Sequence, residues 1–228
     1  MTMPSDHTPL PPPADSSDPV PPKQRDPERT REDILRIATE EFSTHGLSGA
    51  RVDAIAARTH TTKRMIYYYF ESKEGLYSAV LERAYGGIRG VESHMDLDPL
   101  PPETALRRLV EFTFDYHESH PEFIRLVMIE NIHHAAHVRT SKGLRTTNSP
   151  AIAVLSHLLA RGHAEGVFKR QIDAVELHML ISSFCFYRMS NRWTFGALYD
   201  IDVSDPRTRE RQRRLIADAI VQLMMAPN

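Results

Sequence analysis

Residues 51–76 read RVDAIAARTHTTKRMIYYYFESKEGL, and this stretch decides how the N-terminal part of the chain folds. Its apolar residues recur at helical spacing on both sides of the interval RTHTT, which is too polar to lie inside one continuous buried face. Two short helices joined by a tight turn fit this pattern and form a helix-turn-helix. Longer amphipathic helices are predicted on either side, from the expected N-cap Thr30 to Gly46 and from Ser72 onward.

The start of the second short helix has the chemistry of a DNA-reading element. In a helix-turn-helix these residues face base edges in the major groove, while flanking cations neutralise phosphates. Hydroxyl groups and long hydrogen-bond-donating side chains occupy the start of this helix. Five Lys or Arg residues lie between positions 51 and 73, whereas the same interval has only two carboxylates. The whole chain has a formal net charge of −2, which excludes a protein that coats nucleic acid over its entire surface. Binding is therefore expected at this local patch.

The segment RVDAIAARTHTTKRMIYYYFESKEGLYSAVL resembles the DNA-binding segment of the tetracycline-repressor (TetR) family of bacterial regulators. The match covers about residues 30 to 90, and Y-x-Y-F-x-S-K-E-x-L is its most specific part. The resemblance implies that Ile66, Tyr69 and Phe70 pack inward, and we expect Met65 beside them. The DNA-binding residues predicted on this basis are Arg51, Thr61, Thr62, Lys63, Arg64, Tyr67, Tyr68 and Lys73.

Four positions depart from the family pattern. Thr59 and His60 stand where the family usually has Ala-Gly, and His tolerates a positive φ less easily than Gly. A strained or differently shaped turn is therefore expected. Arg51 replaces a common Thr and Arg64 a common Gly, and each adds a cation at the predicted interface. The operator sequence of a relative therefore does not transfer to this chain.

The composition is that of a soluble globular protein. Hydrophobic residues make up 41% and charged residues 25%. No apolar run approaches the roughly 20 residues that span a bilayer. The N-terminus has no basic segment followed by an apolar core, and the single cysteine leaves no intrachain disulfide. We expect a cytoplasmic protein without membrane association.

The chain divides into three predicted parts with an all-α fold of about nine helices. Residues 1–26 hold eight of the sixteen prolines and almost nothing apolar, so a disordered tail is expected. A helix-turn-helix DNA-binding domain follows over 27–95, and a larger ligand-binding and dimerisation domain over 96–228 begins at the break DLDPLPPE. In the larger part, segments 121–140 and 173–196 are each expected to form one helix.

The resemblance also implies what the larger domain does. It predicts a homodimer through the last two long helices, about 172–197 and 205–225, bound to double-stranded operator DNA with a palindromic sequence. It further predicts release by a small inducer, aromatic or carboxylate-bearing, and no cofactor. The residues expected to bind this inducer are Phe112, Tyr116, Met128, Asn131, His134, Phe184, Tyr187, Arg188 and Trp193. His117 and His178 are further candidate donors.

Two features of this domain allow other interpretations. Arg188 in an apolar stretch needs an anionic partner, which is either a ligand carboxylate or a structural partner such as Glu130 or Asp115. In ENIHHAAH, residues His133 and His137 are four apart on one expected helical face, one turn from Glu130. This spacing allows a metal-sensing regulator, or a helical metal-dependent enzyme. The sequence has no HExxH motif, and we expect no enzyme.

Overall fold

The structure is a computed structural model that describes residues 26–227, with only the backbone described for Ser93, Lys142 and residues 145–150. The tail predicted over 1–26 lies outside the described residues except for Asp26. The described residues form eleven α-helices, and the prediction of an all-α fold is confirmed. The first four are α1 (Pro27–Gly49), α2 (Val52–Arg58), α3 (Lys63–Phe70) and α4 (Lys73–Ser93). The others are α5 (Pro102–Ser119), α6 (Pro121–Ile132), α7 (Ala136–Thr140), α8 (Lys142–Ala164), α9 (Ala174–Ser190), α10 (Arg192–Tyr199) and α11 (Pro206–Met225).

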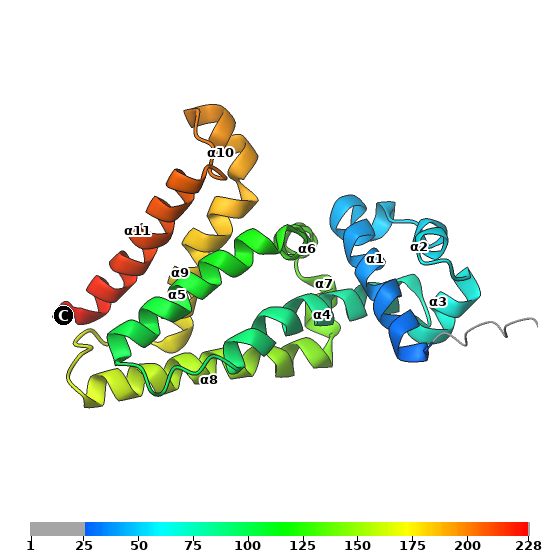
Figure 1. Cartoon of the computed structure of the whole chain (residues 1–228). Helices are drawn as coiled ribbons and strands as arrows, with labels where there is room; N and C mark the ends of the chain where they lie inside the picture. The colour runs from blue at the N-terminus through cyan, green and yellow to red at the C-terminus, as the bar shows by residue number, and fades with distance from the viewer. Residues whose placement is uncertain (1–25, 228) are drawn as a thin grey trace, which may run out of the picture.

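Helices α1, α2 and α3 form one end of the molecule, and α4 leads away from them into the remaining helices (Figure 1). The apolar positions that recur at helical spacing on these short helices meet in one core. This core contains Ile34, Leu35, Phe42, Val52, Ile55, Ile66 and Phe70. Gly75 allows the start of α4 to approach α3, because a Cβ there would lie 2.1 Å from the Phe70 carbonyl oxygen.

Helix α4 belongs to two cores. Its first half contributes Leu76 and Tyr77 to the N-terminal core, which Leu126 of α6 and Leu144 of α8 also enter. Its second half contributes Ile88 to a smaller cluster with residues of α5, α6 and α9. The division into domains at residue 95 stays a prediction, but the two parts share this helix.

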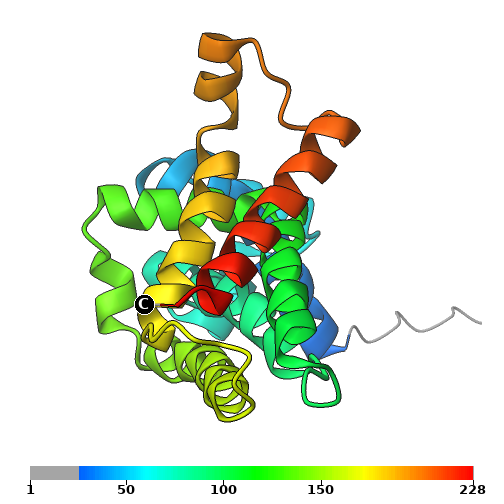
Figure 2. The same cartoon turned by 90° about the vertical axis from the view of Figure 1, so that its left-hand side faces the viewer.

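The larger part is a helical bundle around its own core. Helices α5, α8, α9 and α11 supply most of that core, including Leu106, Phe114, Leu158, Leu177 and Val221. Helices α9 and α11 lie side by side at the end of the molecule opposite α1 to α3, and α10 projects beyond them (Figures 1 and 2). Over 26–227, no helix is long and apolar enough to cross a membrane.

The described residues form eleven helices where about nine were predicted, because two predicted helices are each divided. The segment 121–140 leaves the helix at His133, since His134 and Ala135 both adopt a left-handed backbone with φ of 56°. The segment 173–196 is interrupted at Asn191, which ends α9 and precedes α10. Apolar periodicity continues through both breaks, so it did not reveal them.

The first helix also differs in its start. Asp26 caps α1 by accepting a hydrogen bond from the Glu28 amide at 3.1 Å, so the helix begins one turn before the predicted cap Thr30. The predicted break at Gly46 is confirmed, because the backbone of Gly46 is not helical, with φ of 65° and ψ of 176°.

His60 gives a test of backbone strain in the turn between α2 and α3. Its φ is 51°, in the region that glycine adopts without steric cost. We expect His60→Gly to raise the free energy of unfolding by roughly 0.5–1 kcal/mol, measured by urea denaturation. In the control Ala57→Gly, at an exposed helical position, the same free energy should fall by about 1 kcal/mol. Equal losses in both variants would show that the turn is unstrained.

Candidate DNA interface and ligand cavity

The side chains of the first turn of α3 point toward solvent. Thr62 is the N-cap, and its hydroxyl oxygen accepts a hydrogen bond from the Met65 amide at 3.2 Å. Ile66 and Phe70 are buried on the opposite face and anchor the helix in the N-terminal core. Tyr69 is half-buried against that core, whereas Met65 is exposed, so the expected inward packing of Met65 is wrong.

The predicted DNA-binding residues lie together on the surface of this end of the molecule. Tyr68 is 77% exposed and Tyr67 is 36% exposed, so both phenol groups reach solvent. The Lys63 ammonium lies 3.3 Å from the Asp53 carboxylate, an exposed pair that a phosphate can replace. Arg51 and Arg64 are exposed, whereas Thr61 and Lys73 are half-buried.

Two contacts fix the flanks of this surface. The amide of Arg51 donates to the carboxylate of Glu41 at 3.0 Å, so α2 begins against a buried acid of α1. The Lys73 ammonium donates to the carbonyl of Ser48 at 3.4 Å, which places this cation at the junction of α1 and α4. The exposed side of α3 is therefore flanked by cations, the arrangement expected of a helix that enters a major groove.

A cavity of about 320 Å³ lies between α4, α5, α6 and α9. Its walls are largely apolar, with the aromatic rings of Tyr85, Phe123 and Phe186. A few polar groups converge on it: Arg89, His117, Asn131, His178 and Ser182. Mostly apolar walls with a few oriented polar groups are typical of small-molecule sites.

The cavity contains one buried ion pair and two neutral histidines. The Arg89 guanidinium donates to the Glu92 carboxylate at 2.6 Å, and the other end of the guanidinium lies 3.5 Å from Nε2 of His178. Burial lowers the pKa of His117 to about 4. Burial and then the charge of Arg89 lower the pKa of His178 to about 4. Both rings are therefore uncharged at neutral pH.

The His117 ring is buried beside this cavity, at 4% exposure. Its Nδ1 has almost no accessible surface and makes no side-chain hydrogen bond within the described part of the chain. The Cys185 backbone beside the ring raises the pKa of His117 against the larger effect of burial.

A buried carboxylate joins the cavity region to the end of the molecule formed by α1, α2 and α3. Oε1 of Glu130 accepts hydrogen bonds from the Tyr77 hydroxyl and from Nδ1 of His137, each at 3.0 Å. Its Oε2 accepts the backbone amides of His137 and Val138 at 3.2 and 3.3 Å. The Tyr77 ring in turn packs edge-on against Phe42 of α1. Glu130 therefore connects α4, α6 and α7.

The expected helical face with three metal ligands is wrong. His133 ends α6, and the left-handed residues that follow turn the chain before His137, so the three residues are not aligned on one helix. Glu130 is occupied by Tyr77 and His137. No cluster of three or more potential metal ligands occurs among the described residues.

Arg188 is held by structural partners. Its guanidinium donates to Glu118 at 3.0 Å, to Gln212 at 2.7 Å and to the carbonyl of Val203 at 2.5 Å. It also lies over the Phe114 ring, 4.4 Å from the centroid. The structural interpretation of this residue therefore holds, with Glu118 as its partner in place of the expected Glu130 or Asp115.

The nine residues expected to bind the inducer do not converge. Asn131 lines the cavity, and Phe112 and Tyr116 belong to the cluster that surrounds it. Phe184 and Tyr187 line a groove between α9 and α11, and Met128 and His134 are exposed on α6 and after it. The sequence did not lead to a prediction of Arg89 or Tyr85 as cavity residues. The single Arg in the segment GGIRGV was the one signal that pointed to a buried charge.

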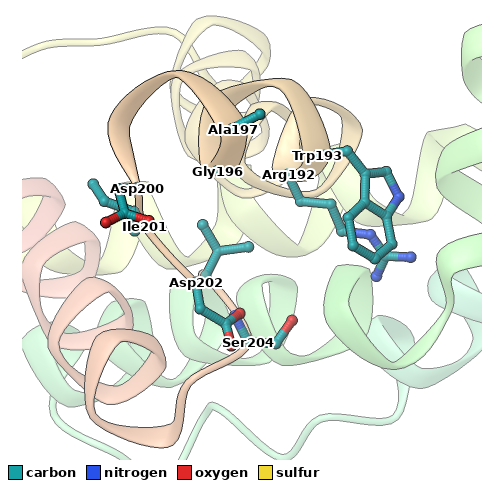
Figure 3. Close-up of a pocket in the computed structure, with 9 residues that line it drawn as sticks. Arg192, Trp193, Gly196, Ala197, Asp200, Ile201, Asp202 and Ser204 are labelled. Atoms are coloured by element: carbon teal, nitrogen blue, oxygen red, sulfur yellow. The ribbon is translucent and has the colours of Figure 1, made fainter.

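Trp193 lies on α10, which projects at the tip of the molecule, and it does not line the cavity. It lines a shallow hollow of about 310 Å³ between α10 and residues 200–204 (Figure 3). The Arg192 guanidinium covers its ring at 4.6 Å from the centroid. Trp193 therefore contacts its own neighbour at the surface and does not line the cavity between α4, α5, α6 and α9.

The contact between Tyr77 and Glu130 gives a prediction about stability. Tyr77→Phe removes one donor from a buried carboxylate and should lower the free energy of unfolding by about 1.5–3 kcal/mol, measured by chemical denaturation. Tyr68→Phe is the matched control, because its hydroxyl is exposed, and it should change that free energy by less than about 0.5 kcal/mol. Equal effects of the two variants would contradict the assigned role of Glu130.

Comparison with known proteins agrees with these features. A family model described as "Bacterial regulatory proteins, tetR family" matches residues 34–80, and one described as "Tetracyclin repressor-like, C-terminal domain" matches residues 102–220. The HTH-type transcriptional repressor NicS of Pseudomonas putida is 37% identical over 191 residues, which cover 84% of this chain and 90% of that protein. The HTH-type transcriptional repressor SCO4008 of Streptomyces coelicolor is 38% identical over 108 residues, 47% of this chain and 53% of that protein.

Solved structures show the same architecture. The putative transcriptional regulator SCO4942 from Streptomyces coelicolor superposes with a TM-score of 0.65 at 27% identity, covering 87% of this chain and 99% of that one. The fatty acid degradation regulator FadR from Bacillus halodurans shares the fold alone, with a TM-score of 0.63 at 19% identity over 90% of this chain and 97% of that one. The chain therefore belongs to the TetR family and is a DNA-binding transcriptional regulator.

Proposed function

We propose that this regulator is a homodimeric repressor that binds a palindromic operator through α3 and is released by a small aromatic inducer in the cavity. The observation that carries the proposal is the exposed, cation-flanked first turn of α3 on a buried helix-turn-helix core. The two curated relatives described above are both named repressors, which supports repression as the direction of control.

The proposed DNA contacts follow from exposure and chemistry. Tyr67, Lys63 and Lys73 present one hydroxyl and two ammonium groups at the surface, which suits phosphate oxygens. Arg64 and Tyr68 stand on the exposed side of α3, where a helix in the major groove meets base edges. The hydroxyl of Thr62 accepts the Met65 amide and keeps its own proton to donate.

The proposed dimer uses the outer faces of α9 and α11. A groove of about 570 Å³ runs between them and is lined almost entirely by apolar side chains, among them Leu180, Phe184, Tyr187 and Ile216. Met179 of α9 and Leu215 of α11 are further exposed apolar residues of these two helices, at 67% and 58% exposure. A contiguous exposed apolar face of this kind is typical of a protein–protein interface.

The proposed response to the inducer runs through helices that the cavity and the DNA-binding end share. Arg89 of α4 and Asn131 of α6 line the cavity, and Tyr77 of α4 bonds to Glu130 of α6. A ligand that favours another spacing of α4 and α6 changes the placement of α3 in each half of the dimer. An affinity difference between the two states of about 1 to 3 kcal/mol is enough to weaken DNA binding by one or two orders of magnitude.

The DNA contacts give a prediction that separates phosphate from base contacts. Tyr67→Ala and Lys73→Ala should weaken binding to all DNA sequences, and Lys73→Ala should reduce the slope of log affinity against log salt by about one. Arg64→Ala should instead change the base preference. Fluorescence anisotropy across a salt series measures these effects, with Lys169→Ala as an exposed, distant control of equal charge change. Unchanged binding in all three interface variants would refute the proposed site.

The dimer face gives a second prediction. Leu180→Glu places a carboxylate in the apolar groove and should raise the dimer dissociation constant by at least about 100-fold, because an unpaired charge would be buried. Sedimentation velocity measures this change. Ile132→Glu on α6 is the control, since its side chain is also exposed, at 71%, but lies away from the groove. A dimer that survives Leu180→Glu and dissociates with Ile132→Glu would assign the interface to another face.

A further inference from the structure

We propose that α10 is an arm that packs on α11 of the partner subunit in the dimer. The inference rests on the proposed function, because it extends the proposed dimer face between α9 and α11. In a two-fold dimer the contact is reciprocal, so each subunit supplies one arm and one docking surface. The arm comprises residues 192–202, and the docking surface is the outer side of α11 over residues 206–218.

Helix α10 exposes large apolar side chains. None of its eight residues is buried, and the helix projects beyond α9 and α11 (Figures 1 and 2). Trp193, Leu198 and Tyr199 are 74%, 76% and 62% exposed. Single exposed apolar residues are common, but three large ones on so short a helix are typical of a segment that another protein chain covers.

A row of aromatic rings connects α10 to the proposed dimer face. Tyr187 lines the groove between α9 and α11. The centroid of its ring lies 6.2 Å from that of Phe195 on α10, and the Phe195 ring lies 4.6 Å from that of Tyr199. A subunit that covers the groove therefore also meets the rings of α10. This continuity makes a second copy of the chain the occupant.

The docking surface on α11 is continuous with the same groove. Ala219 lines the groove, and Leu215 precedes it by about one helical turn. Leu215 lines a shallow hollow of about 650 Å³ on the outer side of α11 and is 58% exposed there. The hollow is otherwise lined by Pro206, Arg207, Glu210, Arg211, Arg214 and Asp218.

The hollow on α11 has an excess of positive charge. Both of its acids already take part in ion pairs, at 2.6 and 2.7 Å. Arg207 and Arg211 are exposed, and neither forms an ion pair with another residue that the structure describes. Two guanidinium groups are therefore available to acids of another subunit.

The end of α10 has the opposite charge. Asp200 and Asp202 line the hollow beside Trp193, where residues 200–204 pass below α10 (Figure 3). Asp202 accepts a hydrogen bond from the Ser204 amide at 2.8 Å, and neither carboxylate pairs with a cation within residues 26–227. Opposite charges across an interface fix its register and exclude other partners. The acids of the arm therefore complement the two cations of the docking surface.

The arm and the docking surface also lie where a two-fold axis can bring them together. Helix α10 and the start of α11 are at the same end of the pair formed by α9 and α11 (Figures 1 and 2). An axis along this pair places α10 of each subunit beside the first half of the partner's α11.

Trp193 is the only tryptophan of the chain, so its fluorescence reports directly on the arm. Acrylamide should quench it with at least about a twofold lower constant in the wild-type dimer than in Leu180→Glu, because a packed interface excludes the quencher. Sedimentation velocity shows which of the two proteins is dimeric. Equal quenching of a wild-type dimer and a Leu180→Glu monomer would overturn the arm contact and leave the dimer face intact. A monomeric wild type, or a dimeric Leu180→Glu, would refute the dimer face of the proposed function and the arm with it.

Charge reversal tests where the arm docks. Arg207→Glu with Arg211→Glu, and separately Asp200→Lys with Asp202→Lys, should each raise the dimer dissociation constant at least about tenfold at low salt. An equal mixture of the two variants should form a heterodimer of nearly wild-type affinity, which also shows that both are folded. Arg64→Glu with Arg125→Glu is the control, since it reverses two exposed charges on α3 and α6 and should leave the dimer unchanged. Unweakened dimers in both variants, or weakened dimers that mixing does not restore, would overturn the inference.

Discussion

The hydrogen bonds of the Glu130 carboxylate hold the DNA-binding end to the rest of the molecule. A buried carboxylate is costly unless its oxygens are satisfied, and here Tyr77, His137 and two backbone amides satisfy them. The donors come from α4 and α7, so this one carboxylate joins both helices to α6, in addition to the apolar contacts that α4 and α6 share. Because α4 also enters the core of the helix-turn-helix, a shift of α6 against α4 reaches α3 through packed side chains.

A second set of charges orients the other end of the molecule. Arg209 and Arg213 of α11 pair with acids of α5, Asp115 among them at 2.6 and 3.1 Å. Arg188 of α9 joins the same group through Glu118. These contacts hold the first half of α11 against α5, while its second half contributes Ala217, Val221 and Met224 to the core of the bundle. The groove between α9 and α11 presents apolar residues, where the proposed partner subunit covers them.

The features predicted most accurately from the sequence are those that depend on residues close together in the chain. The helix-turn-helix depends on apolar spacing within about 25 residues, on the helix start at Ser72, and on a turn at His60 whose positive φ matches the expected strain. All of these features can be predicted from residues that lie close together in the sequence. The breaks at His134 and Asn191 could not be predicted in this way, because apolar periodicity continues across them and tertiary packing decides where the chain turns.

Most of the residues that line the cavity could not be predicted from the sequence, for a related reason. Its polar groups come from four helices, and Arg89, His117 and His178 lie far apart in the chain. Of the three, His117 and His178 were candidates by residue type, whereas Arg89 was hidden in a helix expected to be simply amphipathic. For Arg188 the sequence left a ligand carboxylate and a structural partner both open, and the residue bonds to Glu118 and Gln212.

The central claim, that the protein binds a palindromic operator as a dimer, is tested most directly in two steps. Bound sequences are selected from a random pool of duplex DNA, and the most enriched sequence is then examined by hydroxyl-radical footprinting. Two symmetric copies of α3 should enrich a palindrome and protect two half-sites whose centres lie about one helical turn, or a multiple of it, apart. Enrichment of no sequence, or protection of a single half-site without a symmetric mate, would contradict the account of a dimeric operator-binding regulator.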